Sequence, residues 1–417
     1  MKALFRLMGN LLSIILPLSI LFVGAMFQSD FVSGFLLFSF LPIALYQLGM
    51  LFYRVGGWNV RRILSRNRIR AGESISIKLN IQRRIGFPLS YCKIEEVFPF
   101  SLQKIDTREA KYHYLNNPNR LHVERTSKRI VFPGFKREFE IPYDIQKLPR
   151  GIHQLQAIRI RTGDMFGFIK KEHVFQVTDS LIVYPNERPI CLQEPNNTIA
   201  QGSLSSHALH FKNINIASGS REYIPGDKFS WIDWKQTASK NKIMTKEFEQ
   251  EKSVDTVVIL DSCYDHAMNH LAFEAAVEVT TSLIETLHRQ SVTAGLLTVD
   301  KEIHYFPKQH HDVRNHLAQI HPNGKRPFAN LLKEASMTMK SPPSLWIVTN
   351  NLNEALGQTL KELKQRSTSI ALFLVQPSAM IYQRDYQRID RLHGYGIEVR
   401  LISEKQLVKN PIEVNGI

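Results

Sequence analysis

The sequence predicts a protein of three structural parts: an N-terminal transmembrane helical hairpin, an antiparallel β-sandwich and a C-terminal α/β domain with a doubly wound sheet. Two long apolar segments near the N-terminus predict the hairpin. Short alternating runs then predict the sandwich, and apolar strands that alternate with amphipathic helices predict the α/β domain. We divide the chain into a hairpin with a basic segment, a sandwich, a linker with a signature segment, and the α/β domain, at residues 1–70, 71–190, 191–251 and 252–417.

The N-terminal region has the composition of a membrane anchor. Residues 7–27 and 31–53 are each apolar over about the twenty positions that a spanning helix needs, and residues 28–30 leave room only for a tight turn. Basic residues flank the pair, with six arginines in residues 54–70. We therefore expect two spans in the cell membrane with both termini cytoplasmic. The alternatives are a cleaved signal peptide, disfavoured because no cleavage site separates the segments, or two buried core helices.

Charge and cysteine content restrict the classes of partner. The formal net charge is +15, and part of the excess lies in residues 54–70, where a membrane surface explains it more simply than nucleic acid. Beyond this charge, the sequence contains no nucleic-acid-binding motif. The three cysteines, Cys92, Cys191 and Cys263, are odd in number and lack metal-ligand spacing, which indicates a reduced compartment.

Residues 71–190 have the pattern of short strands separated by turns. Ile75, Ile77 and Leu79 alternate with polar residues, as in a strand with one buried face. Similar runs occur at residues 129–132, 135–141, 153–160, 168–175 and 180–184. Because no helical pattern intervenes, we expect an antiparallel sandwich, with Gly163, Asp164 and Gly167 in a turn.

The C-terminal part changes from strands alone to strands and helices in alternation. Residues 191–220 are small and polar and predict a linker. Strands are expected at residues 255–260, 292–299, 345–349, 370–375 and 397–401, and helices at 273–287, 353–365 and 383–393. In the first helix, Glu274, Glu278 and Glu285 are expected on the face opposite the apolar one. This alternation is typical of a parallel sheet with helices on both faces.

A segment before the α/β domain is dense in side chains suited to recognition. Arginine can pair with a carboxylate through two bonds, and aromatic residues expose large apolar faces. The positions that we assign to partner binding or to a structural signature are Arg221, Glu222, Tyr223, Pro225, Gly226, Asp227, Asp233 and Trp234. In a structural interpretation, Asp227 and Asp233 cap turns, while Trp231 and Trp234 pack the segment onto the sheet. In a functional one, the same segment forms a rigid surface that a partner protein binds.

The order and spacing of these residues resemble the signature of the family called domain of unknown function 58. The resemblance continues to Glu247 and Glu251 and covers roughly residues 140–300. Ser230 departs from it, because the family commonly has a basic residue there. What is known of similar proteins implies partnership with a MoxR-type AAA+ ATPase in the assembly or activation of membrane or envelope complexes.

The region around Asp261 resembles a von Willebrand factor type A domain. In that fold an Asp-x-Ser-x-Ser run, a Thr and a second Asp bind a divalent metal, whereas this chain has Asp261-Ser262-Cys263-Tyr264-Asp265. Cys263 replaces a hydroxyl ligand, and a thiol is a poor ligand for Mg²⁺. Asn350 replaces the later Asp. We therefore expect a degraded site in which Asp261 and Asp265 remain, and no cofactor unless Mg²⁺ binds there. In a purely structural role, Asp261 caps the following helix and anchors its loop.

Together these features predict a membrane-anchored, cytoplasm-facing interaction or scaffold protein without enzymatic activity. The sequence contains no phosphate-binding Gly-x-x-x-x-Gly-Lys loop, zinc-binding His-Glu-x-x-His pair or Gly-x-Ser-x-Gly nucleophile motif. The alternative is a metal-assisted enzyme with a carboxylate centre at Asp227, Asp233 and Asp261. That alternative requires the three carboxylates to converge.

Overall fold

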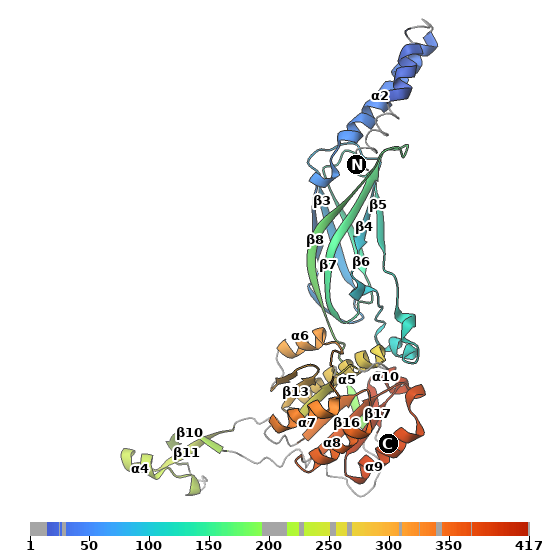
Figure 1. Cartoon of the computed structure of the whole chain (residues 1–417). Coiled ribbons are helices and arrows are strands. Elements are labelled where there is room, and N and C mark those ends of the chain that lie inside the picture. Colours follow the sequence, from blue (N-terminus) through green and yellow to red (C-terminus); the bar gives the residue numbers. More distant parts are fainter. Residues whose placement is uncertain are drawn as a thin grey trace. The chain divides into compact units, whose positions relative to one another are not determined.

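The computed structural model divides the chain into two compact units, residues 1–186 and 187–417 (Figure 1). The residues that it describes are 15–24, 26, 31–193, 215–224, 229–250, 256–264, 269–307, 311–324, 326–338, 344–367 and 369–415. The first unit contains helices and a β-sandwich. The second contains an α/β domain and a smaller β-hairpin module, so that several structural parts are present as the sequence indicates.

The first unit begins with apolar helices. Helix α2 (Phe31–Phe52) has 22 residues, and its Gly34–Phe52 window, with a mean hydropathy of 1.9, is long and apolar enough to cross a membrane. A shorter apolar helix covers Ile15–Gly24. The expected turn at residues 28–30 lies outside the described residues. Within the part of the chain that the structure describes, one helix is of spanning length, and the second span and the orientation stay predictions.

Helix α2 continues into the sandwich without a linker. Ala44 and Met50 belong to the same hydrophobic cluster as the sandwich core. The ring of Tyr46 stacks on that of Phe87, with centroids 5.6 Å apart. The ammonium group of Lys171 donates hydrogen bonds to the carbonyls of Leu51 and Tyr53 at the end of the helix. The last turns of α2 are thus held by packing and by capping.

Two sheets form the sandwich. One contains β1 (Asn59–Leu64), β3 (Ile75–Gln82) and β6 (Glu138–Ile145), in the order β1-β3-β6. The other contains β2 (Arg68–Arg70), β8 (Lys170–Tyr184), β7 (Gly151–Gly163), β4 (Tyr91–Val97) and β5 (Ser127–Val131), in the order β2-β8-β7-β4-β5. Neighbouring strands are antiparallel except for the β2–β8 pair. Short 3₁₀ helices occur at Val55–Gly57, Phe100–Leu102, Arg108–Tyr114 and Pro118–Leu121.

The alternation in the sequence arises from the burial pattern of these strands. In β3 the isoleucine and leucine side chains are buried and the intervening residues are exposed or half-buried. The two runs expected at 168–175 and 180–184 form the single strand β8, and β4 was not expected. The turn at Gly163, Asp164 and Gly167 is confirmed between β7 and β8, with Gly167 in the left-handed region at φ +80°.

Strands β1 and β2 precede residue 71, so the expected boundary between the basic segment and the sandwich differs from the structure. The interpretation of residues 54–70 as a membrane-surface segment also needs one correction. Arg62 lies in β1 with a side chain that is 0% exposed, because it is paired in the core with Glu96 and Asp179. Arg54, Arg61, Arg66, Arg68 and Arg70 are exposed.

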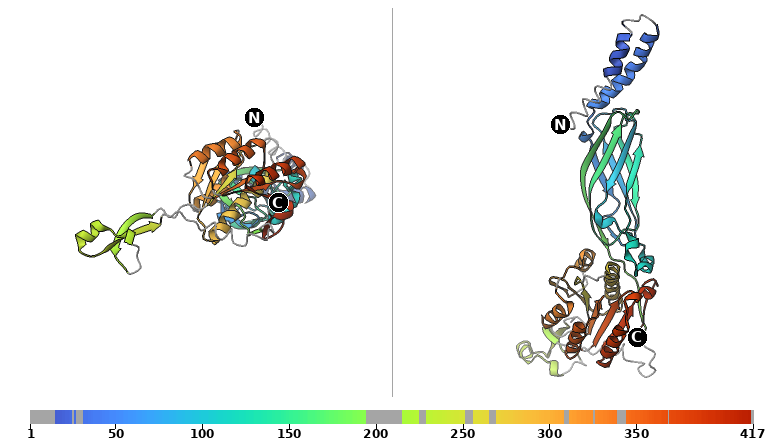
Figure 2. Two further views of the ribbon diagram at one scale, coloured as in Figure 1. Left: turned by 90° about the horizontal axis from the view of Figure 1, so that it is seen from below. Right: turned by 45° about the vertical axis from the view of Figure 1, so that its right-hand side comes forward.

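The second unit is built on a six-stranded sheet with helices on both faces (Figure 2). Its strands are β12 (Thr256–Asp261), β13 (Ala294–Val299), β14 (Ile303–Phe306), β15 (Ser344–Thr349), β16 (Ser369–Val375) and β17 (Glu398–Ile402), and their order is β14-β13-β12-β15-β16-β17. All neighbours are parallel except β14, which runs antiparallel to β13. The strand order reverses at β12, so that β12 and β15 flank the switch point where open α/β sheets bind ligands.

The helices of this unit are α5 (His270–Arg289), α6 (His311–Gln319), α7 (Phe328–Thr338), α8 (Glu354–Lys364), α9 (Gln383–Gly394) and α10 (Glu404–Leu407). A short 3₁₀ helix covers Ser378–Met380. Helices α7, α8 and α9 contribute to one core cluster with the sheet, and α5 contacts β12, β13, β15 and β16. Two further strands, β9 (Ile190–Gln193) and β18 (Ile412–Asn415), pair in parallel. The expected strands and helices are present, whereas β9, β14, β18, α6, α7 and α10 were missed.

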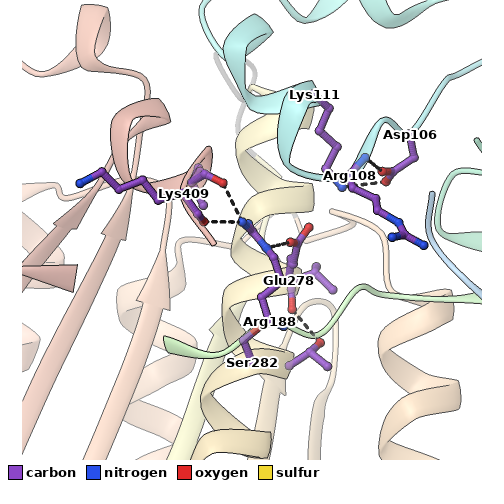
Figure 3. Close-up of polar contacts among 10 residues, drawn as sticks. Asp106, Arg108, Lys111, Arg188, Glu278, Ser282 and Lys409 are labelled. Atoms are coloured by element: carbon purple, nitrogen blue, oxygen red, sulfur yellow. Dashed lines mark hydrogen bonds and ion pairs between the residues drawn. The ribbon is translucent and has the colours of Figure 1, made fainter. Parts of the chain in front are cut away.

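Glu278 corrects the expected amphipathic pattern of α5. It was expected on the face of the helix opposite the apolar one, but it is 1% exposed. Its carboxylate is 2.6 Å from Nε of Arg188, and both side chains are 2% exposed (Figure 3). The buried surface of α5 is therefore wider than its apolar sequence pattern indicates.

Candidate functional site

The signature segment forms a hairpin module. Strands β10 (Asn215–Glu222) and β11 (Met244–Gln250) pair antiparallel, and between them lie a 3₁₀ helix (Phe229–Trp231) and α4 (Trp234–Lys240). The linker expected at residues 191–220 is thus strand from Asn215 onward. The amide of Tyr223 donates to the carbonyl of Ile243 at 2.9 Å, and the amide of Asp233 donates to that of Met244 at 2.8 Å. The segment between the strands is consequently tied to the start of β11.

Asp233 has a local structural role in this module. Its carboxylate accepts hydrogen bonds from the amides of Lys235 at 3.1 Å and Gln236 at 3.2 Å, which makes it the N-cap of α4. The hydroxyl of Thr237 donates to the Asp233 carbonyl and accepts from the Met244 amide. The capping prediction for Asp233 is confirmed. Pro225, Gly226 and Asp227 lie outside the described residues.

Among the described side chains of the module, more large apolar ones are exposed than buried. Ile232 and Met244 are buried, whereas the side chains exposed to solvent are Ile224, Phe229, Trp234 and Ile243, with relative exposures of 57%, 79%, 69% and 52%. The expectation that Trp234 packs the segment is therefore wrong. Its position directly after the cap leaves it on the first turn of a seven-residue helix with no buried residue.

The ion pair of the signature segment contributes little to the stability of the module. Glu222 and Lys242 form an ion pair at 2.8 Å, with both side chains about two-thirds exposed. Solvent screens exposed pairs of this kind, so that they contribute little to stability. Arg221 donates from Nη1 to the Glu222 carbonyl at 3.1 Å. Together with the exposed apolar side chains, these residues form a mixed apolar and charged surface.

Asp261, the first residue of the metal site that the sequence predicts to be degraded, lies at the carboxyl end of β12. Its carboxylate accepts hydrogen bonds from the Thr349 hydroxyl at 2.6 Å and the Cys263 amide at 3.0 Å. The expected anchoring of the loop is thus confirmed. The expected capping of α5 is wrong, because Asn269 is the N-cap and accepts from the amides of Leu271 and Ala272. Asp261 instead links the carboxyl ends of β12 and β15 across the switch point.

The neighbouring oxygen and sulfur atoms are already engaged by protein groups. The hydroxyl of Ser262, which is 0% exposed, donates to the Val299 carbonyl at 2.8 Å. Burial raises the pKa of the Cys263 thiol, and the charges of Asp261 and Asp300 raise it further. A neutral thiol is a poor ligand for a hard cation. Among the described residues no group of three or more His, Cys, Asp or Glu side chains could hold a metal, and Asp265 lies outside them.

The carboxyl ends of β15 and β16 carry two further polar side chains. The amide of Gln376 donates to the Asn350 carbonyl at 2.6 Å. Both side-chain amide atoms of Asn350 and Oε1 of Gln376 are buried without a hydrogen-bond partner among the described residues. Buried polar atoms without a partner mark strain or a place where solvent or a ligand binds. Asn350 was identified from the sequence only as a substitute for an aspartate, and Gln376 was missed.

The two described carboxylates of the alternative enzymatic centre have different structural roles. Asp233 caps α4, Asp261 anchors the loop after β12, and Asp227 lies outside the described residues. A centre made of the three carboxylates stays a prediction that these contacts do not support.

The first unit contains two open cavities that the sequence did not indicate. One, of about 470 Å³, is lined by Gly72, Glu73, Ser74, Arg108, Gln146 and Lys147. The other, of about 420 Å³, is lined by Ile105, Thr107, Tyr114, Arg120, Leu121 and Lys147. Arg108 and Lys147 both have a left-handed backbone, with φ +55° and +54°. Because arginine and lysine rarely adopt that conformation, the sequence contained no signal for it.

Comparison with known proteins agrees with the resemblance at the level of the family domain. The model of the family described as "Protein of unknown function DUF58" matches residues 219–381, which include most of the hairpin module and most of the α/β domain. The chain is also 29% identical over 388 residues to the "Uncharacterized protein YeaD" of Bacillus subtilis (strain 168), covering 91% of this chain and 92% of that protein. Neither description names an activity.

Solved structures do not add a fold assignment. The PilB minor pilin from Streptococcus sanguinis is 8% identical, with 78% of this chain and 87% of that chain covered at a TM-score of 0.27. The CARDB domain of the PF1109 protein from Pyrococcus furiosus is 9% identical, with 30% of this chain and 91% of that chain covered at a TM-score of 0.18. TM-scores this low carry no argument about fold or function.

Proposed function

We propose that this chain is a membrane-anchored, cytoplasm-facing interaction protein, and that the hairpin module at residues 215–250 binds its partner. The observation that carries the proposal is the exposure of Phe229 and Trp234, with Ile224 and Ile243, on the hairpin module. The signature residue Asp233 holds this module in place by capping α4. Such side chains are stabilised when a partner removes them from water. Aromatic residues contribute disproportionately to binding energy in protein interfaces.

The anchor in this proposal is α2, with the first apolar segment as its companion span. Gly34–Phe52 is long and apolar enough to cross a bilayer, and α2 is packed on the sandwich rather than joined by a flexible linker. The excess of arginine after α2 favours a cytoplasmic position for the sandwich and the second unit. The chain would then hold its partner near the inner face of the membrane.

For the second unit we propose a von Willebrand factor type A-like domain. Its strand order, its antiparallel edge strand β14 and the aspartate at the end of β12 support this proposal. The engaged Ser262 and the neutral Cys263 thiol favour a role in protein contacts over metal-dependent binding. The proposed partner is a MoxR-type AAA+ ATPase, and this part rests on the resemblance of the signature segment alone.

Replacement of Trp234 by alanine is expected to weaken partner binding. Removal of an exposed aromatic anchor typically costs about 2 kcal/mol, which corresponds to roughly a thirtyfold loss of affinity. The measurement is recovery of the ATPase with tagged full-length protein from detergent-solubilised membranes, with and without ATP. Phe100→Ala is the control, because Phe100 is 74% exposed and lies in the first unit.

Equal recovery with Trp234→Ala and Phe100→Ala would remove the hairpin module as the binding element. Failure of the unaltered chain to recover any ATPase, with nucleotide present, would remove the proposed partner.

A further inference from the structure

Three loops meet at one end of the sandwich. Strand pairing places Gln82 opposite Glu138, Cys92 opposite Val131 and Gly163 opposite Lys170. The loops at this end therefore comprise residues 83–90, 132–137 and 164–169. Phe100, which follows the other terminus of β4, lies at the opposite end of the sandwich.

The three loops, here called the tip loops, expose a set of large apolar side chains. These are Ile85, Phe132, Phe135, Met165, Phe166 and Phe168, with relative exposures of 62%, 75%, 74%, 77%, 55% and 59%. Six such side chains on three adjacent loops are not isolated surface residues. Exposed apolar groups that cluster in this way mark a surface that contacts another protein or a membrane.

Exposed cations outnumber exposed acids beside the apolar side chains. Glu138, directly after loop 132–137, is exposed and accepts hydrogen bonds from Asn80 and Gln82. Arg84, Lys136, Arg137 and Lys170 are exposed in the tip loops or directly after them. The acid within the loops, Asp164, is 1% exposed and accepts hydrogen bonds from the amides of Ile169 and Phe166. The outer surface of the tip loops is thus apolar and positively charged, which complements an anionic lipid surface.

The apolar helix α2 reaches the sandwich at this same end. A Cβ on Gly49 would lie 2.8 Å from Cε2 of Phe87, so glycine is needed for helix and loop to approach so closely. The Tyr46 hydroxyl is 3.1 Å from the Ser90 hydroxyl. Lys171, one residue beyond Lys170, caps the end of α2. Helix α2 therefore meets the sandwich at the end that carries the tip loops, where the apolar helices extend from it (Figure 2).

Internal hydrogen bonds hold the tip loops in place. The guanidinium group of Arg83, in a residue 4% exposed, donates to the carbonyls of Phe87 at 2.9 Å and Gly134 at 3.0 Å, and to that of Lys136. The Arg83 amide donates to the Arg137 carbonyl at 2.7 Å. Arg83 thus joins loops 83–90 and 132–137 to each other through backbone carbonyls.

We propose that the tip loops insert their apolar side chains into the headgroup region of an anionic bilayer. Phenylalanine and methionine enter the interface, while arginine and lysine contact lipid phosphates, as in interfacial membrane segments. The sandwich would then stand on the membrane with a defined orientation instead of moving freely about α2. This inference rests on the membrane anchoring in the proposed function and adds a second, peripheral contact to it.

The test is fluorescence quenching in vesicles of phosphatidylcholine and phosphatidylglycerol, with or without brominated acyl chains. Full-length Phe135→Trp is compared with Phe100→Trp, because both phenylalanines are 74% exposed but lie at opposite ends of the sandwich. The measured quantity is the tryptophan fluorescence of the variant minus that of the unaltered protein. For Phe135→Trp this difference should fall about twofold in brominated vesicles, because the ring at position 135 lies at the depth of the interface. For Phe100→Trp it should not change.

The outcomes separate this inference from the anchoring on which it rests. If the protein floats with the vesicles and neither Phe135→Trp nor Phe166→Trp is quenched, the tip loops face water or protein and the inference is overturned, while the anchor stands. If the unaltered protein does not float, the anchoring itself fails. Quenching of Phe166→Trp alone supports the inference where Phe135→Trp does not fold.

Discussion

Arg62→Met is expected to lower the free energy of unfolding of the sandwich by about 3 kcal/mol. Arg62 donates to Glu96 at 2.6 Å, to Asp179 at 2.8 Å and to the Val177 carbonyl at 2.7 Å. Burial opposes its charge, but Glu96, Tyr143 and Asp179 hold the pKa of Arg62 above its ordinary value. Removal of the cation leaves Glu96 buried, with the Tyr143 hydroxyl at 2.6 Å as its remaining close donor.

Hydrogen exchange of the β7 and β8 peptides in detergent measures this loss, because these long strands contribute to the sandwich core. A loss of about 3 kcal/mol corresponds to exchange that is roughly a hundredfold faster. Arg61→Met is the matched control, since Arg61 precedes Arg62 in β1 but is exposed. Exchange rates that were the same in both variants would show that the buried pairs do not stabilise the sandwich.

Arg188→Met is expected to destabilise the second unit by about 3 kcal/mol or more. Its Nε donates to Glu278 at 2.6 Å, and its Nη1 donates to the carbonyls of Leu407 and Lys409 at 2.8 and 2.9 Å (Figure 3). The Arg188 amide donates to the Ser282 hydroxyl at 3.0 Å. The Arg188 side chain thus joins the segment before β9 to α5 and to the end of α10. Methionine keeps the backbone amide bond to Ser282 but can replace none of the side-chain hydrogen bonds.

The corresponding measurement is hydrogen exchange in peptides of α5 and β18, with the sandwich peptides as an internal reference. Arg289→Met is the control, because Arg289 pairs with Glu285 at 3.3 Å on the same helix and is 64% exposed. Its removal should change the stability by roughly 0.5 kcal/mol or less. Fast exchange confined to the last turn of α5 in Arg188→Met would contradict the role assigned to the pair.

Features that depend on local sequence were predicted correctly. The alternating residues of β3 and the apolar runs of β12, β15 and β16 depend on a period that a short window contains. The Asp233 cap is also local, because its donors lie two and three residues ahead. The hairpin β10–β11 was missed, because its strand residues include Gly219 and Ser220, which are uncommon in strands.

Features that depend on residues far apart in the chain could not be predicted. Glu278 is expected on the polar face of its helix until Arg188, 90 residues earlier, neutralises it. Arg62 belongs to an arginine-rich segment, and only its partner Glu96, 34 residues later, explains its burial. Asp261 likewise bonds Thr349 across 88 residues. A single sequence contains the two members of each pair but not their contact.

The exposed aromatic residues show a different limit. Trp234 carries the same sequence signal whether it packs inward or faces a partner, because an aromatic side chain suits both environments. Its 69% exposure distinguishes the two. The same holds for Phe135, which the sequence places at the start of a strand, and for Phe166, which it places in a turn. Neither pattern indicates that the two rings are exposed at the same end of the sandwich.

The central claim is that α2 anchors an interaction protein in the membrane. Alkaline carbonate extraction of membranes from cells that express the full-length chain tests it most directly, because this wash releases peripheral proteins and retains spanning helices. The account predicts that the protein stays in the membrane pellet. Its release into the wash would contradict the anchor and, with it, the proposed function.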